Sequence, residues 1–307
     1  MKSERWKKIQ HRIEYFFLQG FILLTWMVSL KTILLVADCL GWFVFSVLRV
    51  RRVVVLDNLA RAFPEKSNEE RLVIAVRCYK NFCKMMFEYI RFPLLDKETV
   101  FSLCSVEGLE HFDWALERGK GAVLVGGHFG NWEFMGAALA QMGYPISFLV
   151  GEQHNKFVDD MMNEHRRVMG IRIIHMGIAV RGVIRTLRSN RFVALLSDQD
   201  ARSEGIFVDF FGRPSSTHQG PAVFALKTGA PIIFGSAIRL PYGRHRLVID
   251  RLCFDHLEGI TQENIREVTQ AYTSLLERWI RDYPDHWFWM HRRWKTSPMR
   301  EGETTEG

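Results

Sequence analysis

The feature that most constrains the fold is an alternation of short apolar runs with amphipathic segments from Gly108 onward. Short apolar runs are typical of buried strands, and apolar residues at helical spacing are typical of amphipathic helices. The expected strands are 122–125, 146–150, 171–174, 192–196, 232–238 and 247–249, and the expected helices are 134–142, 157–169, 180–188 and 221–228. This order predicts an α/β fold with a mostly parallel central sheet flanked by helices.

The N-terminal segment is expected to anchor the chain to a membrane. From Tyr15 to Leu48 the only formally charged residues are Lys31 and Asp38, and basic clusters flank the stretch. As one helix it would be about 50 Å long, against a hydrocarbon core of about 30 Å. We therefore expect one spanning helix near 16–36 followed by an interfacial helix, or a shallow hairpin with both basic flanks on the cytoplasmic side. A buried pair of core helices is the alternative.

The chain divides into four expected parts. These are a membrane anchor (1–50), a helical segment that packs on the catalytic domain (51–107), the catalytic α/β domain (108–295) and a disordered tail (296–307). In the helical segment, Pro64 is expected to end a basic helix, and Ser67 with Glu70 has the spacing of a capping box at the start of the next one.

Composition narrows the class of partner. The formal net charge is +7 and the sequence pI is about 9.2, which favours phospholipid head groups, a phosphorylated substrate, an acidic carrier protein or nucleic acid. The five cysteines form no Cys-x-x-Cys pair, so we interpret them as reduced core residues and expect neither a disulfide framework nor a zinc site.

The candidate chemistry lies in Gly126-Gly-His-Phe-Gly-Asn-Trp-Glu133. His128 directly follows a predicted strand and two glycines, where a parallel sheet presents functional residues. Asn131 is a plausible N-cap, which puts Glu133 in the first turn of the next helix. We expect the Glu133 carboxylate to hold one imidazole nitrogen of His128 and leave the other free to accept a proton. A satisfied structural histidine is the alternative interpretation.

The sequence lacks the patterns of several other chemistries. It has no Gly-x-Ser-x-Gly elbow, Walker loop, Gly-x-Gly-x-x-Gly fingerprint or His-Glu-x-x-His zinc helix. A His and carboxylate pair without an adjacent Ser or Cys nucleophile favours direct attack by a substrate hydroxyl.

The segment from Gly126 to Glu133 resembles the His-x4-acid motif of the glycerolipid and lysophospholipid acyltransferase superfamily, specifically its lipid A late acyltransferase branch. Three further stretches are similar to that branch. They are 51–71, the central block from Ser197 through Gly212 and Thr217 to Ala230, and Trp287-Phe-Trp-Met-His-Arg-Arg-Trp-Lys295.

The resemblance implies transfer of a fatty acyl chain from acyl carrier protein, or from acyl-CoA, to a hydroxyl of a membrane glycolipid. It implies no other cofactor, no nucleic acid and a place at the cytoplasmic face of the bacterial inner membrane. His128 would be the general base and Glu133 would orient it. The resemblance also implies substrate-binding roles for Arg166, Asp198, Gln199 and Asn131.

The sequence departs from the pattern of the branch in the two glycines before His128 and in Asp209, where the branch often has proline. A lipid A precursor is the expected acceptor, with a lysophospholipid or a mannosylated phosphoinositide as alternatives. From other classes, the chain could be a membrane-anchored nucleic-acid-binding protein or an acyltransferase fold that only binds lipid. We expect 287–295 to pack the sheet edge, with Arg292 and Arg293 exposed.

Overall fold

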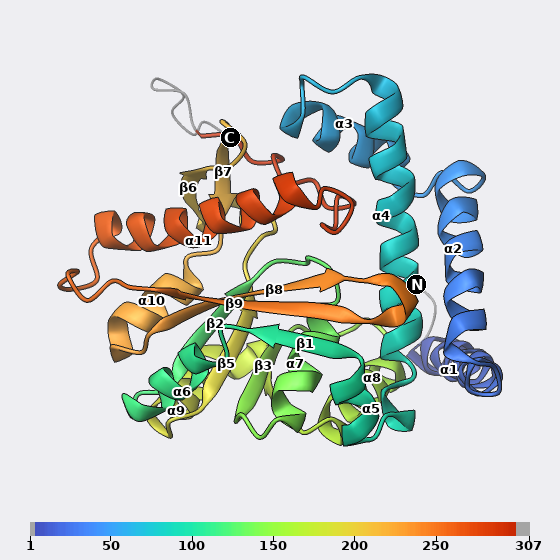
Figure 1. Ribbon diagram of the computed structural model, residues 1–307, viewed down its shortest axis with the longest axis horizontal. Helices are drawn as coiled ribbons and strands as arrows, with labels where there is room; N and C mark the ends of the chain where they lie inside the picture. The colour runs from blue at the N-terminus through green and yellow to red at the C-terminus, as the bar shows by residue number, and fades with distance from the viewer. Residues whose placement is uncertain (1–3, 299–307) are drawn as a thin grey trace.

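The computed structural model describes residues 4–298 of the protein. Its centre is a seven-stranded sheet in the order β1-β9-β8-β2-β5-β3-β4 (Figure 1). The strands are β1 (Cys104–Glu107), β2 (Ala122–Gly126), β3 (Ile146–Val150), β4 (Arg172–His175), β5 (Phe192–Leu196), β8 (Ile232–Arg239) and β9 (His245–Leu252). All neighbours in the sheet are parallel except β8 and β9, so the predicted mostly parallel sheet is confirmed.

The expected strands all form, and their bounds shift by no more than three residues. The strand β1 and the separate antiparallel hairpin of β6 (Ile206–Asp209) with β7 (Pro214–Thr217) were not predicted. The residues of β1 are Cys-Ser-Val-Glu, which contain no continuous apolar run. Their pairing with β9, far away in the sequence, places them in the sheet.

Helices cover both faces of the sheet (Figure 1). On one face lie α9 (Ala179–Arg188), α10 (Gly220–Thr228) and α11 (Gln262–Asp282), and on the other lie α5 (Lys97–Ser102), α6 (Glu110–Glu117), α7 (Trp132–Gln141) and α8 (Lys156–Val168). Side chains alternate along each strand, so Val123 and Val125 of β2 join the core under α11 while Ala122 joins the core under α7. The short 3-10 helices are η1 (Phe92–Leu94), η2 (Met176–Ile178), η3 (Arg202–Glu204) and η4 (Pro241–Gly243).

The N-terminal region is a set of four helices, α1 (Glu4–Trp26), α2 (Leu30–Ser46), α3 (Arg52–Ala62) and α4 (Asn68–Tyr89). The long helix α4 runs beside α2 (Figure 1), and Lys84 of α4 pairs with Asp38 of α2 at 2.8 Å. The capping box before α4 is confirmed, because the Ser67 side chain accepts from Glu70 N–H and the Glu70 side chain accepts from Ser67 N–H.

The prediction of a single spanning helix near 16–36 is wrong, because two helices, α1 and α2, cover this stretch. The chain breaks at Met27–Ser29, where the Ser29 hydroxyl accepts from Thr32 N–H at 3.2 Å and starts a new helix. Over residues 4–298 none of the helices has both the length and the apolar character needed to cross a bilayer. Many apolar side chains of α1, and that of Met27 directly after it, are nonetheless exposed, among them Phe16 (74%), Phe17 (71%) and Met27 (82%).

The cysteines do not all lie in the core. Cys78 is buried, but Cys39 and Cys253 are exposed, so these two are not the core residues we expected. Residues 299–307 of the expected disordered tail lie outside the described residues, as does Lys2 of the N-terminal basic cluster.

Candidate active site

The loop that carries His128 begins where β2 ends, at the carboxyl edge of the parallel strands. Gly130 has φ +61°, and a Cβ there would lie 1.6 Å from the carbonyl oxygen of Ala237. Only glycine fits this close approach. The C-terminal segment fixes the loop further, because Phe288 N–H donates to His128 O at 2.9 Å and Gly130 N–H donates to His286 O at 2.8 Å.

The carboxylate that holds the imidazole belongs to Asp198. His128 Nδ1 lies 2.7 Å from Asp198 Oδ1, and His128 N–H donates to Asp198 Oδ2, also at 2.7 Å. The indole N–H of Trp287 donates to the same Oδ2 at 2.7 Å. A carboxylate only accepts, so Nδ1 carries the hydrogen and Nε2 keeps its lone pair. This fixes the tautomer that a general base requires.

The electrostatics of this pair favour a proton-accepting imidazole. Burial opposes the charged form of His128, but the Asp198 carboxylate outweighs it and raises the pKa of the imidazole above its ordinary value. Burial also disfavours the Asp198 anion, yet its attraction to His128 and its three hydrogen bonds lower its pKa to about 2. Asp198 is therefore a permanent anion behind the histidine. Its side chain is only 2% exposed, so it does not offer itself to a substrate.

Glu133 does not hold His128 as we expected. Its carboxylate accepts two hydrogen bonds from Arg166 of α8, from Nε at 3.0 Å and from Nη2 at 2.6 Å. Arg166 also donates through Nη1 to Asn163 Oδ1 at 3.0 Å and lies over the ring of Tyr89. An arginine has five N–H donors. These three bonds leave two free to face a ligand.

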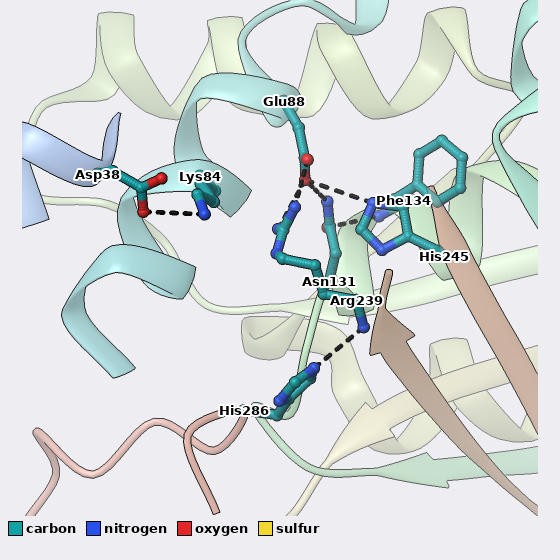
Figure 2. A network of polar contacts seen from close by, with 8 residues as sticks. All are labelled: Asp38, Lys84, Glu88, Asn131, Phe134, Arg239, His245 and His286. Carbon is teal, nitrogen blue, oxygen red and sulfur yellow. Dashed lines mark hydrogen bonds and ion pairs between the residues drawn. The ribbon is translucent and has the colours of Figure 1, made fainter. Parts of the chain in front are cut away.

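The side chain of Asn131 is bound within the protein, to Glu88 and to the start of α7 (Figure 2). Its Oδ1 accepts from Phe134 N–H at 2.9 Å, so it is the N-cap we predicted, and its Nδ2 donates to Glu88 Oε2 at 2.6 Å. The side chain is fully buried and is not among the residues that line the cavity beside His128.

Glu88, at the end of α4, accepts two bonds from Arg239 of β8, at 2.5 and 2.8 Å, and lies 3.5 Å from His245 of β9 (Figure 2). Arg239 holds the pKa of Glu88 well below its usual range, although burial works in the opposite direction. This buried charge network joins α4, α7, β8 and β9 at Asn131, where the loop that carries His128 ends.

A cavity of about 610 Å³ opens beside His128. The charged, amide and imidazole side chains that line it are His128, Glu133, Glu152, Gln153, Arg166, Gln199 and His218. Its other lining side chains are mainly apolar and come from α4, α7 and the strands β2, β3, β5 and β8. The arrangement therefore places the His128 imidazole and the Arg166 guanidinium at the edge of a space suited to a hydrocarbon chain.

The structure thus brings together four of the six predicted site residues, His128, Glu133, Arg166 and Gln199, and puts Asp198 and Asn131 behind them. Two tryptophans of the site were not predicted from the sequence. The ring of Trp132 contacts the His128 imidazole edge-on, with centroids 4.9 Å apart. The indole N–H of Trp287 is a hydrogen-bond donor to Asp198. Sequence reasoning also misjudged Arg293, which is 1% exposed and donates to Ser216 O and Thr217 Oγ1. Among residues 4–298, no cluster of His, Cys, Asp or Glu is arranged to hold a metal ion.

An imidazole and carboxylate pair at the mouth of a largely apolar cavity can activate a hydroxyl group beside a bound hydrocarbon chain. The model of the family described as "Bacterial lipid A biosynthesis acyltransferase" matches residues 2–296, and the chain belongs to this family. The predicted family is confirmed.

Known proteins of two kinds are similar to this chain. It is 28% identical over 193 residues to a phosphatidylinositol mannoside acyltransferase of Mycobacterium tuberculosis (strain CDC 1551 / Oshkosh), a match that covers 62% of this chain and 59% of that protein, under two thirds of its length. It is 25% identical over 258 residues to a lipid A biosynthesis palmitoleoyltransferase of Escherichia coli (strain K12), with 83% and 82% covered. A lipid A biosynthesis lauroyltransferase of the same strain is 24% identical over 264 residues, with 84% of each chain covered.

Proposed function

We propose that this protein transfers a fatty acyl group from a thioester to a hydroxyl of a membrane glycolipid, with His128 as general base. The observation that carries the proposal is the 2.7 Å pairing of His128 Nδ1 with Asp198, which leaves Nε2 free beside an apolar cavity. Membership of the acyltransferase family supports the same reaction.

The proposed reaction needs no covalent enzyme intermediate. Nε2 of His128 accepts the proton of the acceptor hydroxyl as its oxygen attacks the thioester carbonyl, and a C–O bond forms. The C–S bond then breaks, and the departing thiolate takes the proton from the imidazolium. The products are an ester and a free thiol, and His128 returns to its neutral form. Asp198 stabilises the imidazolium between the two proton transfers.

Arg166 is the proposed electrophilic group. Its two remaining N–H donors are available to the oxygen that becomes negative in the transition state, or to a phosphate of a substrate. Glu133 holds the guanidinium by two bonds, so Arg166 is oriented before substrate arrives. Glu133 is thus a positioning residue for Arg166, while Gln199 contacts substrate from the carboxyl end of the neighbouring strand β5.

We place the acyl chain of the donor in the apolar cavity, with its thioester at His128. The donor is an acyl carrier protein or acyl-CoA, and no other cofactor is required. A lipid A precursor is the first proposed acceptor, in keeping with the family. A mannosylated phosphoinositide is the second, because the relatives from Mycobacterium tuberculosis carry that acceptor in their names.

We further propose that α1 and α2 lie in the interface of the cytoplasmic face of a bacterial inner membrane. Exposed apolar side chains such as Phe16 and Met27, together with the exposed basic residues Lys7, Lys8 and Arg12, support this position. An interfacial helix would bring the cavity close to lipids without crossing the bilayer.

The test is transfer by the purified full-length protein. Acyl carrier protein that carries a radiolabelled acyl thioester, and acyl-CoA labelled in its acyl group, are each offered with a lipid A precursor or a mannosylated phosphoinositide in detergent micelles. An alkali-labile radioactive lipid from one pair supports the proposal and names both substrates. If no pair gives such a lipid, although the protein is folded and binds membranes, the family fold in this chain is a lipid-binding scaffold.

A further inference from the structure

The cavity is built in levels along the strands. Alternate residues of each strand face α7, and the strand pairing puts residues of neighbouring strands side by side. The outer level, nearest His128, contains Gly126 of β2 and Leu196 of β5, and the middle level contains Leu124, Ala194 and Phe148. Levels are two residues apart, which is roughly 7 Å along a strand.

The inner end is closed by aromatic rings. At the level of Ile146, the neighbouring Phe192 is fully buried and does not line the cavity. Phe112 packs edge-on against Phe192 with centroids 5.0 Å apart, and it lies 5.0 Å from the ring of Tyr144. A chain that enters at His128 therefore ends against Phe112 and Ile146.

Phe148 narrows the path between the outer and inner levels. It projects from β3 as far as α7, where a Cβ on Gly136 would lie only 2.1 Å from its Cζ. The absence of a side chain at Gly136 is what lets the ring occupy this position. Beside it, Ala194 is the smallest side chain of the middle level. We therefore place the passage to the inner level beside Ala194.

We propose that Phe148, Ala194 and Gly136 form a constriction that sets the length of acyl chain the protein prefers. The inference rests on the proposed function, since it assigns the cavity to the acyl group. Each methylene that passes the constriction and is buried strengthens binding about fourfold. The size of the opening therefore decides how many carbons contribute.

Two kinds of substitution change the width of the constriction, one by narrowing it and the other by widening it. Ala194→Leu fills the passage, and Gly136→Ala pushes the Phe148 ring toward it, so both are expected to favour shorter chains. Phe148→Ala removes the ring and is expected to favour longer chains, and Phe148→Leu is the milder alternative if Phe148→Ala does not fold. Phe92→Ala is the matched control, because Phe92 is fully buried in the same core and does not line the cavity.

The experiment measures binding and transfer separately on the full-length protein. Binding is the displacement of a fluorescent fatty acid by saturated fatty acids that differ by two carbons, and transfer uses the matching acyl thioesters. We expect opposite shifts of the preferred length in Ala194→Leu and Phe148→Ala, and none in Phe92→Ala. Unchanged binding profiles in the cavity variants, or the same shift in Phe92→Ala, would overturn the inference.

Fatty acid binding tests the constriction and acyl transfer tests the proposed function, so the failure of one can be distinguished from the failure of the other. If the variants shift fatty acid binding while no protein transfers an acyl group, the constriction stands and the proposed function fails. If the wild-type protein transfers acyl groups and the variants keep its length preference, the function stands and the constriction fails. Wild-type binding that does not depend on chain length also overturns the constriction.

Discussion

His128 and Asp198 each lie two residues beyond a matched pair in the sheet. Gly126 of β2 is in register with Leu196 of β5, and the two strands are parallel neighbours, so the residues that follow them leave the sheet side by side. The backbone N–H and the imidazole of His128 then both meet the Asp198 carboxylate. The geometry of the candidate site is therefore a direct consequence of strand order.

Replacing Asp198 with Asn tests this pairing through pH. The base form of His128 is neutral, so transfer should rise with pH through the pKa of His128. Asp198 raises that pKa above its ordinary value, and Asp198→Asn removes the effect while burial still lowers it. We expect the acidic limb of the pH–rate profile to move to lower pH and the maximal rate to fall about 10²–10⁴-fold.

The control for this measurement is Asp160→Asn, which removes an exposed carboxylate on α8. Its profile should match that of the wild-type protein. An acidic limb that stays in place in Asp198→Asn would mean that another group titrates.

Glu133→Gln should act on Arg166 and not on the base. The Glu133 and Arg166 side chains are 9% and 11% exposed, so loss of the charge leaves a largely buried cation unpaired, at a cost of about 3–5 kcal/mol of stability. We expect a lower rate but an acidic limb that moves less than in Asp198→Asn. Chemical denaturation and the pH–rate profile measure the two effects. A larger shift than in Asp198→Asn would restore Glu133 as the partner of His128.

Asn131→Ala should cost stability through two lost bonds. The cap of α7 and the bond to buried Glu88 together predict a loss of about 2–4 kcal/mol in the free energy of unfolding. Asp96→Ala removes the exposed N-cap of α5 and should cost only about 1 kcal/mol. Urea denaturation compares the two. Equal losses would show that the bond to Glu88 contributes nothing.

The double variant Phe16→Ser/Phe17→Ser tests the proposed membrane position. Both rings are more than two thirds exposed on α1, and their loss should weaken binding to anionic vesicles at least tenfold. Ile260→Ser, an exposed apolar residue before α11, is the control. Sedimentation with vesicles at low and high salt gives the affinities. Equal binding of all three proteins would remove α1 from the membrane contact.

The sequence was sufficient for six of the seven strands of the sheet because each of the six contains a short apolar run, which β1 lacks. It also pointed to His128, which follows such a run and two glycines. It did not reveal the partner of His128, since Glu133 is close in sequence whereas Asp198 becomes close only through the adjacency of β2 and β5. Both strands had been predicted, so the missing information was their order.

The burial of Arg293 was unpredictable for a similar reason. The sequence around Arg293 does not distinguish a buried arginine from an exposed one. Its hydrogen-bond acceptors, Ser216 O and Thr217 Oγ1, belong to a hairpin that was not predicted. The break at Met27–Ser29 had a weak signal, because Ser29 is a good N-cap, but the continuous apolar stretch concealed it.

We propose above all that the protein transfers an acyl group to a hydroxyl of a membrane glycolipid, with His128, held by Asp198, as the general base. The most direct measurement is mass spectrometry of glycolipids from cells that lack the protein and carry either the wild-type chain or His128→Ala at equal membrane abundance. We predict that the wild-type chain adds the mass of one ester-linked acyl group to one glycolipid, and that His128→Ala does not. The same lipid in equal amount from His128→Ala would contradict the account.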